Sequence, residues 1–197
     1  MSVRCEGCDR AYDESRFDGG RTIWCACGQR VGIRLVPPWP RSGDAPRFIA
    51  DAMLGRLARW LRLLGVDCAW HPEIDDADLV RCSLEEERVV LTRDRALPDE
   101  WWVSTIYVLP TDDWPEQLVD VMRHFGLAGE TRLFSRCADC NRPLELIAAA
   151  EVAGRVPEDV TQQGLGLHRC PACDRLFWEG SHTDRMRAFV DAVLAEI

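Results

Sequence analysis

The sequence contains no lysine, and all 24 of its basic residues are arginines. They face 33 acidic residues, which gives a formal net charge of −9. An acidic chain cannot bind nucleic acid through its overall charge, because domains that do so are strongly basic. Any contact with a polyanion must therefore be local. Each local basic site carries the planar guanidinium fork, which grips a phosphate group with two hydrogen bonds.

The chain also lacks a long apolar segment. No run of 18 apolar residues occurs, and the N-terminus lacks the charged-then-apolar pattern of a signal peptide. We therefore expect a soluble, cytoplasmic protein with no membrane partner. Ten cysteines in a reducing compartment serve a metal more readily than disulfides. A glycine-rich phosphate loop is missing too, which argues against a P-loop enzyme.

Prolines mark the first boundary along the chain. The stretch VPPWPRSGDAP, from Val36 to Pro46, contains four prolines and cannot continue a helix or a central strand. It predicts a stiff linker. We expect an N-terminal zinc-ribbon-like module at 1–36, the linker at 37–46, a middle domain at 47–128, and a C-terminal zinc ribbon with a terminal helix at 129–197.

The middle domain alternates between strand and helix patterns. Strands are predicted at 47–51, 67–71, 88–92 and 104–109, and helices at 52–64, 76–87 and 113–126, with a short segment at 95–101. Strands separated by helix-length segments need crossover connections. The pattern therefore predicts an α/β fold, with a parallel sheet covered by helices.

Acidic residues follow the ends of the predicted strands, where ligands bind in such sheets. Asp51 and Asp94 each end a strand, Asp112 and Asp113 follow the last one, and Asp76 lies with Asp75 and Asp78 at the start of a helix. Converging carboxylates repel one another unless a cation neutralises them. Oxygen ligands favour Mg²⁺ or Mn²⁺, which support phosphodiester hydrolysis. The alternative is that Asp51 and Asp76 merely cap helices.

Arginines lie near these acids. Arg56, Arg59 and Arg62 recur every third residue along the first predicted helix, and Arg93 and Arg95 bracket Asp94. They are candidates for a phosphate path. A solvated helix face is the alternative, because exposed charges are normal on amphipathic helices.

The cysteines form two groups with the spacing of metal knuckles. Cys137-x₂-Cys140 is followed after 29 residues by Cys170-x₂-Cys173, and Cys5-x₂-Cys8 is followed after 16 residues by Cys25-x-Cys27. Four thiolates close a tetrahedral zinc site, so each zinc would be structural. The tight C-x-C arm departs from the usual spacing. Cys68 and Cys82 fall within apolar patterns and are expected to be buried.

Several of these motifs together resemble the Mut-seven C-terminal RNase family, a PIN-like nuclease domain joined to a zinc ribbon. The resemblance rests on DAMLGRLARWLRLLGVD, DADL, ERVVLTRDRAL, FSRCADCNRPLE, RVP, HRCPACDRLFWEGSH and DRM, between Arg47 and Met186. It implies a PIN-type fold and metal-dependent RNA cleavage. The family's acids fall on Asp51, Asp76 and Asp94, with Asp112 and Asp113 both candidates for the fourth. Residues 1–46 lie outside the resemblance.

The expected function is endonucleolytic hydrolysis of RNA, in single-stranded regions, by an acidic Mg²⁺ or Mn²⁺ site, with ribosome or tRNA as conceivable partners. A second hypothesis is a non-catalytic zinc adaptor that binds RNA or the ribosome and keeps a residual acidic site. A third, a phosphatase or phosphotransfer enzyme, ranks last because Asp51 is not followed by a second Asp two residues on.

Overall fold

The computed structural model describes residues 2–37, 45–152, 154–157, 160, 166–178 and 180–197. Most of the predicted linker at 37–46 lies outside the described residues. The chain divides into two compact units, one formed by Met1–Gly55 and Ala69–Asp112, the other by Arg56–Cys68 and Asp113–Ile197. The predicted domain boundaries remain a prediction.

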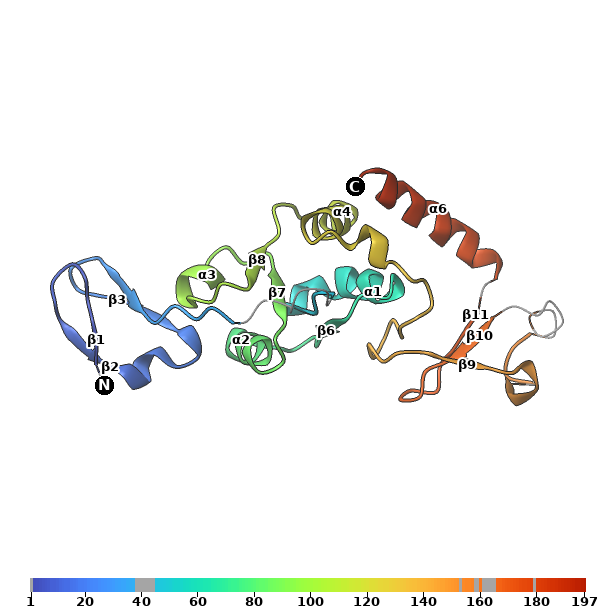
Figure 1. Ribbon diagram of the computed structural model, residues 1–197, viewed down its shortest axis with the longest axis horizontal. Helices are drawn as coiled ribbons and strands as arrows, with labels where there is room; N and C mark the ends of the chain where they lie inside the picture. Colours follow the sequence, from blue (N-terminus) through green and yellow to red (C-terminus); the bar gives the residue numbers. More distant parts are fainter. Residues whose placement is uncertain (1, 38–44, 153, 158–159, 161–165, 179) are drawn as a thin grey trace. The chain divides into compact units, whose positions relative to one another are not determined.

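A four-stranded sheet forms the centre of the fold, in the order β6-β5-β7-β8 (Figure 1). Its strands are β5 (Phe48–Ala50), β6 (Cys68–Trp70), β7 (Val89–Thr92) and β8 (Ile106–Val108). β5 pairs with β7 in parallel, with Ala50 opposite Leu91, and β7 pairs with β8 in parallel, with Thr92 opposite Val108. Every residue of β5 and β7 is buried, as expected for strands covered on both faces.

Helices follow the strands in the predicted order. They are η2 (Ala52–Leu54), α1 (Gly55–Leu63), α2 (Asp76–Glu85), α3 (Leu97–Glu100), α4 (Trp114–His124) and η3 (Leu127–Glu130). α2 packs on β5 and β7. The predicted α/β class, a parallel sheet flanked by helices, is confirmed.

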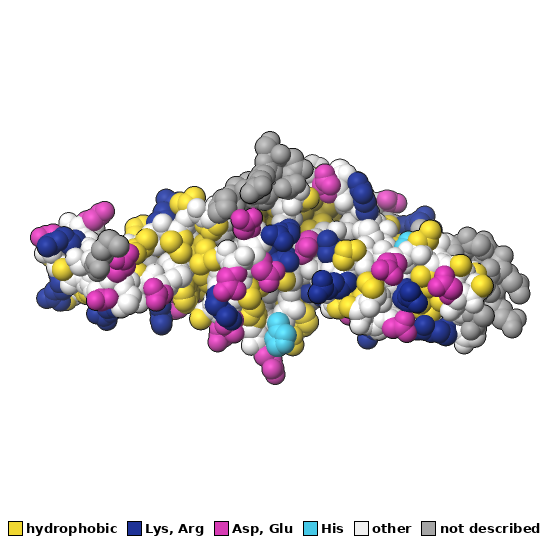
Figure 2. Space-filling view, turned by 60° about the horizontal axis from the view of Figure 1, so that its bottom comes forward, with side chains coloured by type: hydrophobic (Ala, Val, Ile, Leu, Met, Phe, Trp, Pro, Cys, Tyr) yellow, Lys and Arg dark blue, Asp and Glu magenta, His cyan; other side chains and the backbone are white. Residues whose placement is uncertain are grey.

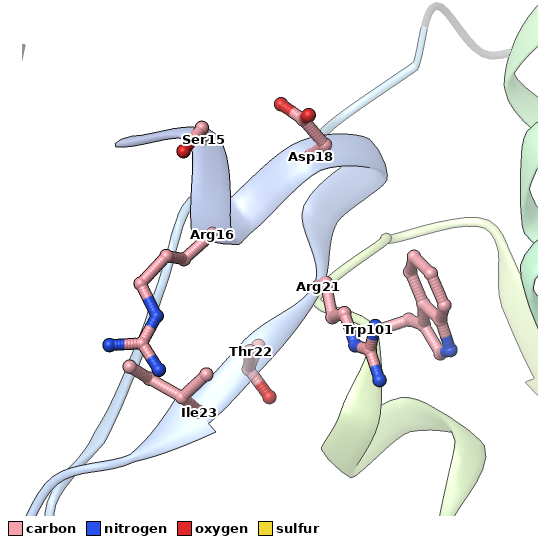
Figure 3. A pocket seen from close by; sticks show the side chains of 7 residues that line it. All are labelled: Ser15, Arg16, Asp18, Arg21, Thr22, Ile23 and Trp101. Carbon is pink, nitrogen blue, oxygen red and sulfur yellow. The ribbon is translucent and has the colours of Figure 1, made fainter. Parts of the chain in front are cut away.

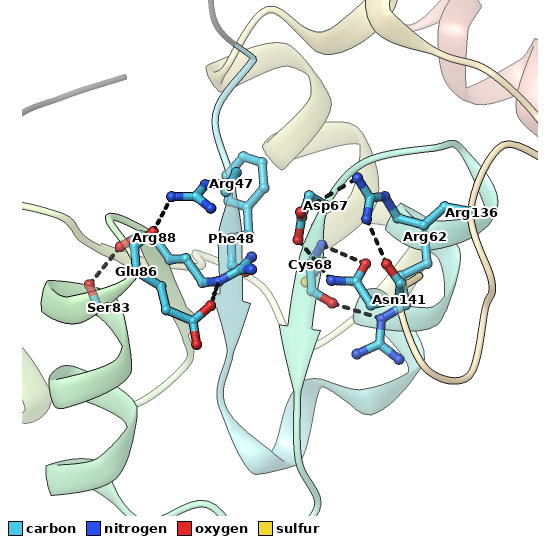
Figure 4. Close-up of polar contacts among 10 residues, drawn as sticks. All are labelled: Arg47, Phe48, Arg62, Asp67, Cys68, Ser83, Glu86, Arg88, Arg136 and Asn141. Atoms are coloured by element: carbon cyan, nitrogen blue, oxygen red, sulfur yellow. Dashed lines mark hydrogen bonds and ion pairs between the residues drawn. The ribbon is translucent and has the colours of Figure 1, made fainter. Parts of the chain in front are cut away.

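Arginines occupy the amino ends of the two central strands (Figure 4). Arg88, just before β7, is buried and donates a hydrogen bond from Nη1 to the carbonyl oxygen of Phe48 at 3.0 Å. Its Nε atom donates to Glu86 at 2.7 Å, and Arg47 donates to the backbone of Glu86. These bonds fix the register of β5 against β7. The basic groups here thus lie at the end of the strands opposite to the acids.

The N-terminal module consists of two antiparallel hairpins and a 3₁₀ segment. β1 (Ser2–Arg4) pairs with β2 (Ala11–Asp13), and β3 (Thr22–Trp24) pairs with β4 (Arg30–Gly32), with η1 (Glu14–Gly20) between them. Its small core contains Phe17 and Val31 together with two cysteines. So small a core cannot stabilise a fold alone, which suits a module that needs a metal.

The C-terminal part has its own antiparallel sheet, in the order β11-β10-β9. The strands are β9 (Glu145–Ile147), β10 (Leu167–Arg169) and β11 (Leu176–Trp178), and the other elements are η4 (Ala149–Val152) and the terminal helix α6 (Ser181–Ala195). α6 packs against α4, and Phe189 of α6 contacts Trp60 and Trp114 at ring-centroid distances of 4.6 and 5.2 Å. Among the described residues, no helix has the length and apolar character needed to cross a membrane.

Candidate active site and metal centres

Asp51 lies directly after β5, in a position set by sheet pairing. Its backbone N–H donates to the carbonyl oxygen of Leu91 in β7 at 2.9 Å. Its side chain is only 6% exposed, and Oδ2 accepts a 2.6 Å hydrogen bond from the hydroxyl of Thr92. The backbone N–H of Asp94 donates in turn to the Thr92 oxygen at 2.9 Å. Thr92 therefore links the two strand-end acids through one hydroxyl group.

Helix capping does not account for Asp51 or Asp76. Asp51 stands at the N-cap of η2 without a side-chain capping bond. The cap of α2 is Asp75, which accepts from the backbone N–H of Asp78 at 2.8 Å, and Asp78 pairs with Arg81 at 2.6 Å. Asp75 and Asp78 thus have structural roles. Asp76 takes part in neither the cap nor the ion pair.

The carboxylates influence one another electrostatically. Burial raises the pKa of Asp76, and the negative charges of Asp51 and Asp94 raise it further. Among the described residues, no basic side chain forms an ion pair with Asp51, Asp76 or Asp94. These three acids, from three different elements, therefore form a negative site that the protein itself does not neutralise.

The two candidates for a fourth acid differ from these three. Asp112 is 86% exposed and pairs with Arg93 at 2.7 Å. Asp113 precedes α4 and belongs to the other compact unit. Within the described part of the chain, the groups that bring three or more potential ligand atoms within 4.8 Å of one another are the two sets of four cysteines. The carboxylates are more widely spaced than that.

The arginines of α1 have unequal surroundings. Arg62 is 4% exposed, and it donates to the carbonyl oxygens of Cys68 at 2.7 Å, Ala138 at 3.2 Å and Asp139 at 2.7 Å. A buried side chain cannot contact RNA, so Arg62 differs from the sequence expectation. Arg59 pairs with Asp139 at 3.0 Å, and Arg56 lies 4.1 Å from the ring centre of Trp114.

Arg95 is exposed beside Asp94, whereas Arg93 is engaged by Asp112. On the face shown in Figure 2, arginine and acidic side chains lie interspersed. Any basic contact surface there is therefore small. This distribution agrees with a chain whose polyanion contacts are local.

Each set of four cysteines has the geometry of a zinc site. The Sγ–Sγ distances are 3.5 Å for Cys5–Cys27 and for Cys8–Cys25, and 3.7 and 3.2 Å for Cys137–Cys173 and Cys140–Cys170. A tetrahedral site with Zn–S bonds of about 2.3 Å requires sulfur atoms about 3.8 Å apart, whereas a disulfide requires about 2.05 Å. Both groups fit zinc, including the one with the tight C-x-C arm.

Hydrogen bonds from the backbone prepare these sulfurs for a metal. A backbone N–H from Cys27 and the hydroxyl of Tyr12 lower the pKa of Cys25 to about 6 in the metal-free protein. Burial, with a hydrogen bond to Cys170, raises the pKa of Cys140 to about 12. Within the N-terminal group, a hydrogen bond with Cys5 raises the pKa of Cys27 to about 12, so neighbouring sulfurs of that group differ in proton affinity. Zinc replaces thiol protons when it binds.

The C-terminal knuckle is bonded to the turn that precedes β6 (Figure 4). Asn141 has a left-handed backbone with φ 64°, and its side chain donates to Asp67 at 2.7 Å and accepts from the backbone N–H of Cys68 at 3.2 Å. Arg136 adds an ion pair with Asp67 at 3.5 Å. Sequence reasoning missed these anchoring roles and that of Thr92. The Asn directly after the second cysteine of the knuckle was the one available signal, because Asn tolerates left-handed conformations.

A pocket in the N-terminal module was also absent from the sequence predictions (Figure 3). Its volume is about 620 Å³, and it is lined by Ser15, Arg16, Asp18, Arg21, Thr22, Ile23 and Trp101. Because Trp101 is far from the others in sequence, no local pattern could have revealed this pocket.

Comparisons with known proteins identify one family for this chain. A search of curated proteins and a search of solved structures each found no significant match. The model of the Mut7-C RNAse domain matches residues 46–190, which is well over half of the 197 residues. This match covers the central sheet, the three acids and the C-terminal cysteine group, and leaves out the N-terminal module. The chain therefore belongs to the Mut7-C RNAse domain family.

Proposed function

We propose that this chain is a metal-dependent endoribonuclease that hydrolyses RNA phosphodiester bonds. The observation that carries the proposal is the set of three carboxylates, Asp51, Asp76 and Asp94, which converge at the carboxyl ends of β5 and β7 without a basic partner among the described residues. Membership of an RNase domain family supports the same reaction. Asp112 and Asp113 stay candidates for a fourth acid.

The donor chemistry of this site fits Mg²⁺ or Mn²⁺. Both ions prefer carboxylate oxygens, and the three acids supply negative charge with no nitrogen or sulfur ligand among them. When bound, such an ion activates water and stabilises charge on the phosphate group. Thr92 holds one oxygen of Asp51 and leaves the other for a ligand. The N–H of Ala96 holds Oδ1 of Asp94 at 2.7 Å in the same way, so both carboxylates are oriented before any ion binds.

RNA would approach this site through its phosphate groups. Arg95 offers an exposed guanidinium beside Asp94. In the other compact unit, Arg56 and Arg59 are exposed on α1, with Arg59 in an ion pair with Asp139. Arg62 is buried and is not part of the proposed contact. Single-stranded RNA suits scattered arginines better than a duplex does, because a flexible backbone can follow them.

A non-catalytic RNA-binding adaptor is a second candidate. The observation in its favour is the spacing of the carboxylates, which do not come within 4.8 Å of one another as a group in the described residues. Like charges hold such groups apart when no cation is bound. The spacing of the carboxylates in a metal-free site is thus compatible with both the ribonuclease and the adaptor, and a cleavage assay decides between these two functions.

Asn substitutions at Asp51 and Asp94 provide this test. Asn keeps the size of Asp and caps helices equally well, but it removes the charge that a hard cation needs. We expect Asp51→Asn and Asp94→Asn each to lower Mg²⁺- or Mn²⁺-dependent cleavage of a mixed single-stranded RNA pool at least about a hundredfold. Zinc content and folding should be unchanged.

Asp78→Asn is the matched control, because it removes an acid of the same rim that already pairs with Arg81. Its cleavage rate should remain within about twofold of the original. If the unmodified chain binds RNA but never cleaves it with either metal, the adaptor is the better account. Equal cleavage by all three variants would remove the acids from the mechanism.

A further inference from the structure

The pocket in Figure 3 joins the N-terminal module to the family-matched part of the chain. Six of its seven lining residues, from Ser15 to Ile23, belong to the module, and Trp101 belongs to the matched segment. Both parts lie in the same compact unit. The pocket therefore exists only where the module meets the segment at 98–104.

Several bonds hold the walls of this pocket together. The backbone N–H of Trp102 donates to the carbonyl oxygen of Gly20 at 2.6 Å. The hydroxyl of Thr22 donates to the backbone carbonyl oxygen of Asp99 at 2.6 Å. Gly20 has a φ of 82°, and a Cβ atom there would lie 3.0 Å from the side chain of Val103. The left-handed backbone of Gly20 and the closeness of Val103 both favour glycine at this position. A tether alone would not produce such contact, so the pocket is preformed.

Two arginines in the pocket keep their charges unneutralised. The guanidinium of Arg16 lies 5.8 Å from the ring centre of Tyr12, and that of Arg21 lies 5.8 Å from the ring centre of Trp101. Among the described residues, neither arginine forms an ion pair with a carboxylate. An aromatic ring positions a guanidinium while leaving its N–H donors free.

The directions of these side chains favour an anion. In Figure 3 Arg16 extends beside Ile23 and Arg21 extends toward Trp101, whereas Asp18 points away from both arginines. Ile23 adds an apolar side chain to the lining of the pocket. The volume of about 620 Å³ is within the range of small-ligand sites and accommodates a nucleotide.

We propose that this pocket binds a phosphate group of single-stranded RNA, with Arg16 and Arg21 as its donors. The choice of RNA as the source of the phosphate rests on the proposed ribonuclease function. An acidic chain needs local basic contacts of this kind to hold a polyanion. The N-terminal module then extends the RNA-contacting surface beyond the family domain, and it retains the strand outside the acidic site.

Binding of a short, labelled single-stranded oligoribonucleotide tests the proposal. Fluorescence anisotropy is measured without Mg²⁺ or Mn²⁺, over a series of salt concentrations, for the full chain and for Arg16→Gln/Arg21→Gln. We expect the double variant to bind at least about tenfold more weakly. We also expect the slope of log affinity against log salt to fall by about 0.7, because one lost phosphate contact on a single strand contributes about 0.7.

A second double variant, Arg4→Gln/Arg34→Gln, removes the same charge from exposed positions of the same module outside the pocket. It should lose much less affinity and keep its salt slope. Zinc content shows that both variants retain the fold of the module. If the two double variants lose equal RNA affinity, the loss reflects net charge alone, and the pocket assignment is wrong.

Inorganic phosphate and AMP serve as competitors that identify the source of the phosphate. Both should displace the oligonucleotide only at concentrations far above its own dissociation constant. If AMP alone binds as tightly as the oligonucleotide, the pocket is a mononucleotide site and the RNA assignment is wrong. Cleavage of a dinucleotide substrate separates this inference from the proposed ribonuclease function. If the protein cleaves the dinucleotide but the Arg16→Gln/Arg21→Gln variant binds RNA as tightly as the original chain, only this inference is wrong.

Discussion

At the scale of single residues, Asp76 reports on the whole acidic site. Its neighbours Asp75 and Asp78 are used by the helix, one as its cap and the other in an ion pair. Burial of Asp76 and the negative charges of Asp51 and Asp94 instead favour the protonated form of Asp76. Its titration is therefore a measure of how strongly the three carboxylates interact.

The raised pKa of Asp76 predicts a pH dependence of stability. The folded chain binds more protons than the unfolded chain between pH 3.8 and the raised pKa, so the contribution of Asp76 to stability is lost as the pH rises through that interval. Asp76→Asn should abolish this loss. At pH values above the raised pKa, the free energy of unfolding of this variant should exceed that of the original chain by up to about 1 kcal/mol, a modest figure because the group is partly exposed.

Urea unfolding of both proteins at pH 4 to 7, without divalent ions, measures this difference. Added Mg²⁺ should narrow it, because a cation relieves the same repulsion. Asp78→Asn is the control, and it should show a small loss of stability with no gain at higher pH. A constant difference between Asp76→Asn and the original chain at every pH would contradict the electrostatic cluster.

At the scale of elements, two of the three arginines of α1 have different roles. Arg59 is exposed and forms one surface ion pair, while Arg62, one turn later, is buried and bonded to three carbonyl oxygens. Two of those oxygens belong to the knuckle between Cys137 and Cys140. Arg62 therefore supports the C-terminal metal site from inside the fold, whereas Arg59 reaches Asp139 of the same knuckle only through an exposed ion pair.

Replacing Arg62 with Met should weaken this support. Met matches much of the length of Arg but leaves the buried carbonyl groups without donors, which costs about 3 kcal/mol in total. The unfolding midpoint should fall by about 6–12 °C at this chain length, and a chelator should remove the C-terminal zinc faster. Arg59→Met, which loses only an exposed pair, should cost less than about 1 kcal/mol. Equal shifts for the two variants would contradict the distinct roles of the two arginines.

At the scale of the whole molecule, the chain has two groups of four cysteines, one in the N-terminal module and one in the C-terminal part. Each brings four sulfur atoms together at distances that fit zinc. Small modules of this kind gain much of their folding free energy from the metal. The N-terminal one also contacts the segment at 98–104, so its folding supports the pocket near Trp101.

The purified chain should therefore contain about two zinc ions. Cys170→Ser should lose one ion and lower thermal stability, and Cys25→Ser should lose the other. Cys68→Ser is the control, because Cys68 is buried outside both groups and should keep both ions. Metal analysis of the three variants measures these losses. A single zinc in the unmodified chain would show that one cysteine group does not bind it.

Much of this architecture was determined by local patterns in the sequence. Apolar runs of strand length, amphipathic segments and paired cysteines predicted the parallel sheet and both metal groups, because each pattern depends on neighbours along the chain. The strand-end positions of Asp51 and Asp94 followed from the same periodicity. Their catalytic role remains a prediction.

Only the tertiary structure distinguished residues that look alike in sequence. Arg59 and Arg62 share one helix and one spacing, yet the knuckle packed beside Arg62 buries it. Asp75 and Asp76 are adjacent, yet the first caps α2 and the second is partly buried within the electrostatic influence of Asp51 and Asp94. The pocket lined by Arg16, Arg21 and Trp101 requires contact between segments far apart in sequence. Burial and charge depend on such distant contacts, which no local pattern encodes.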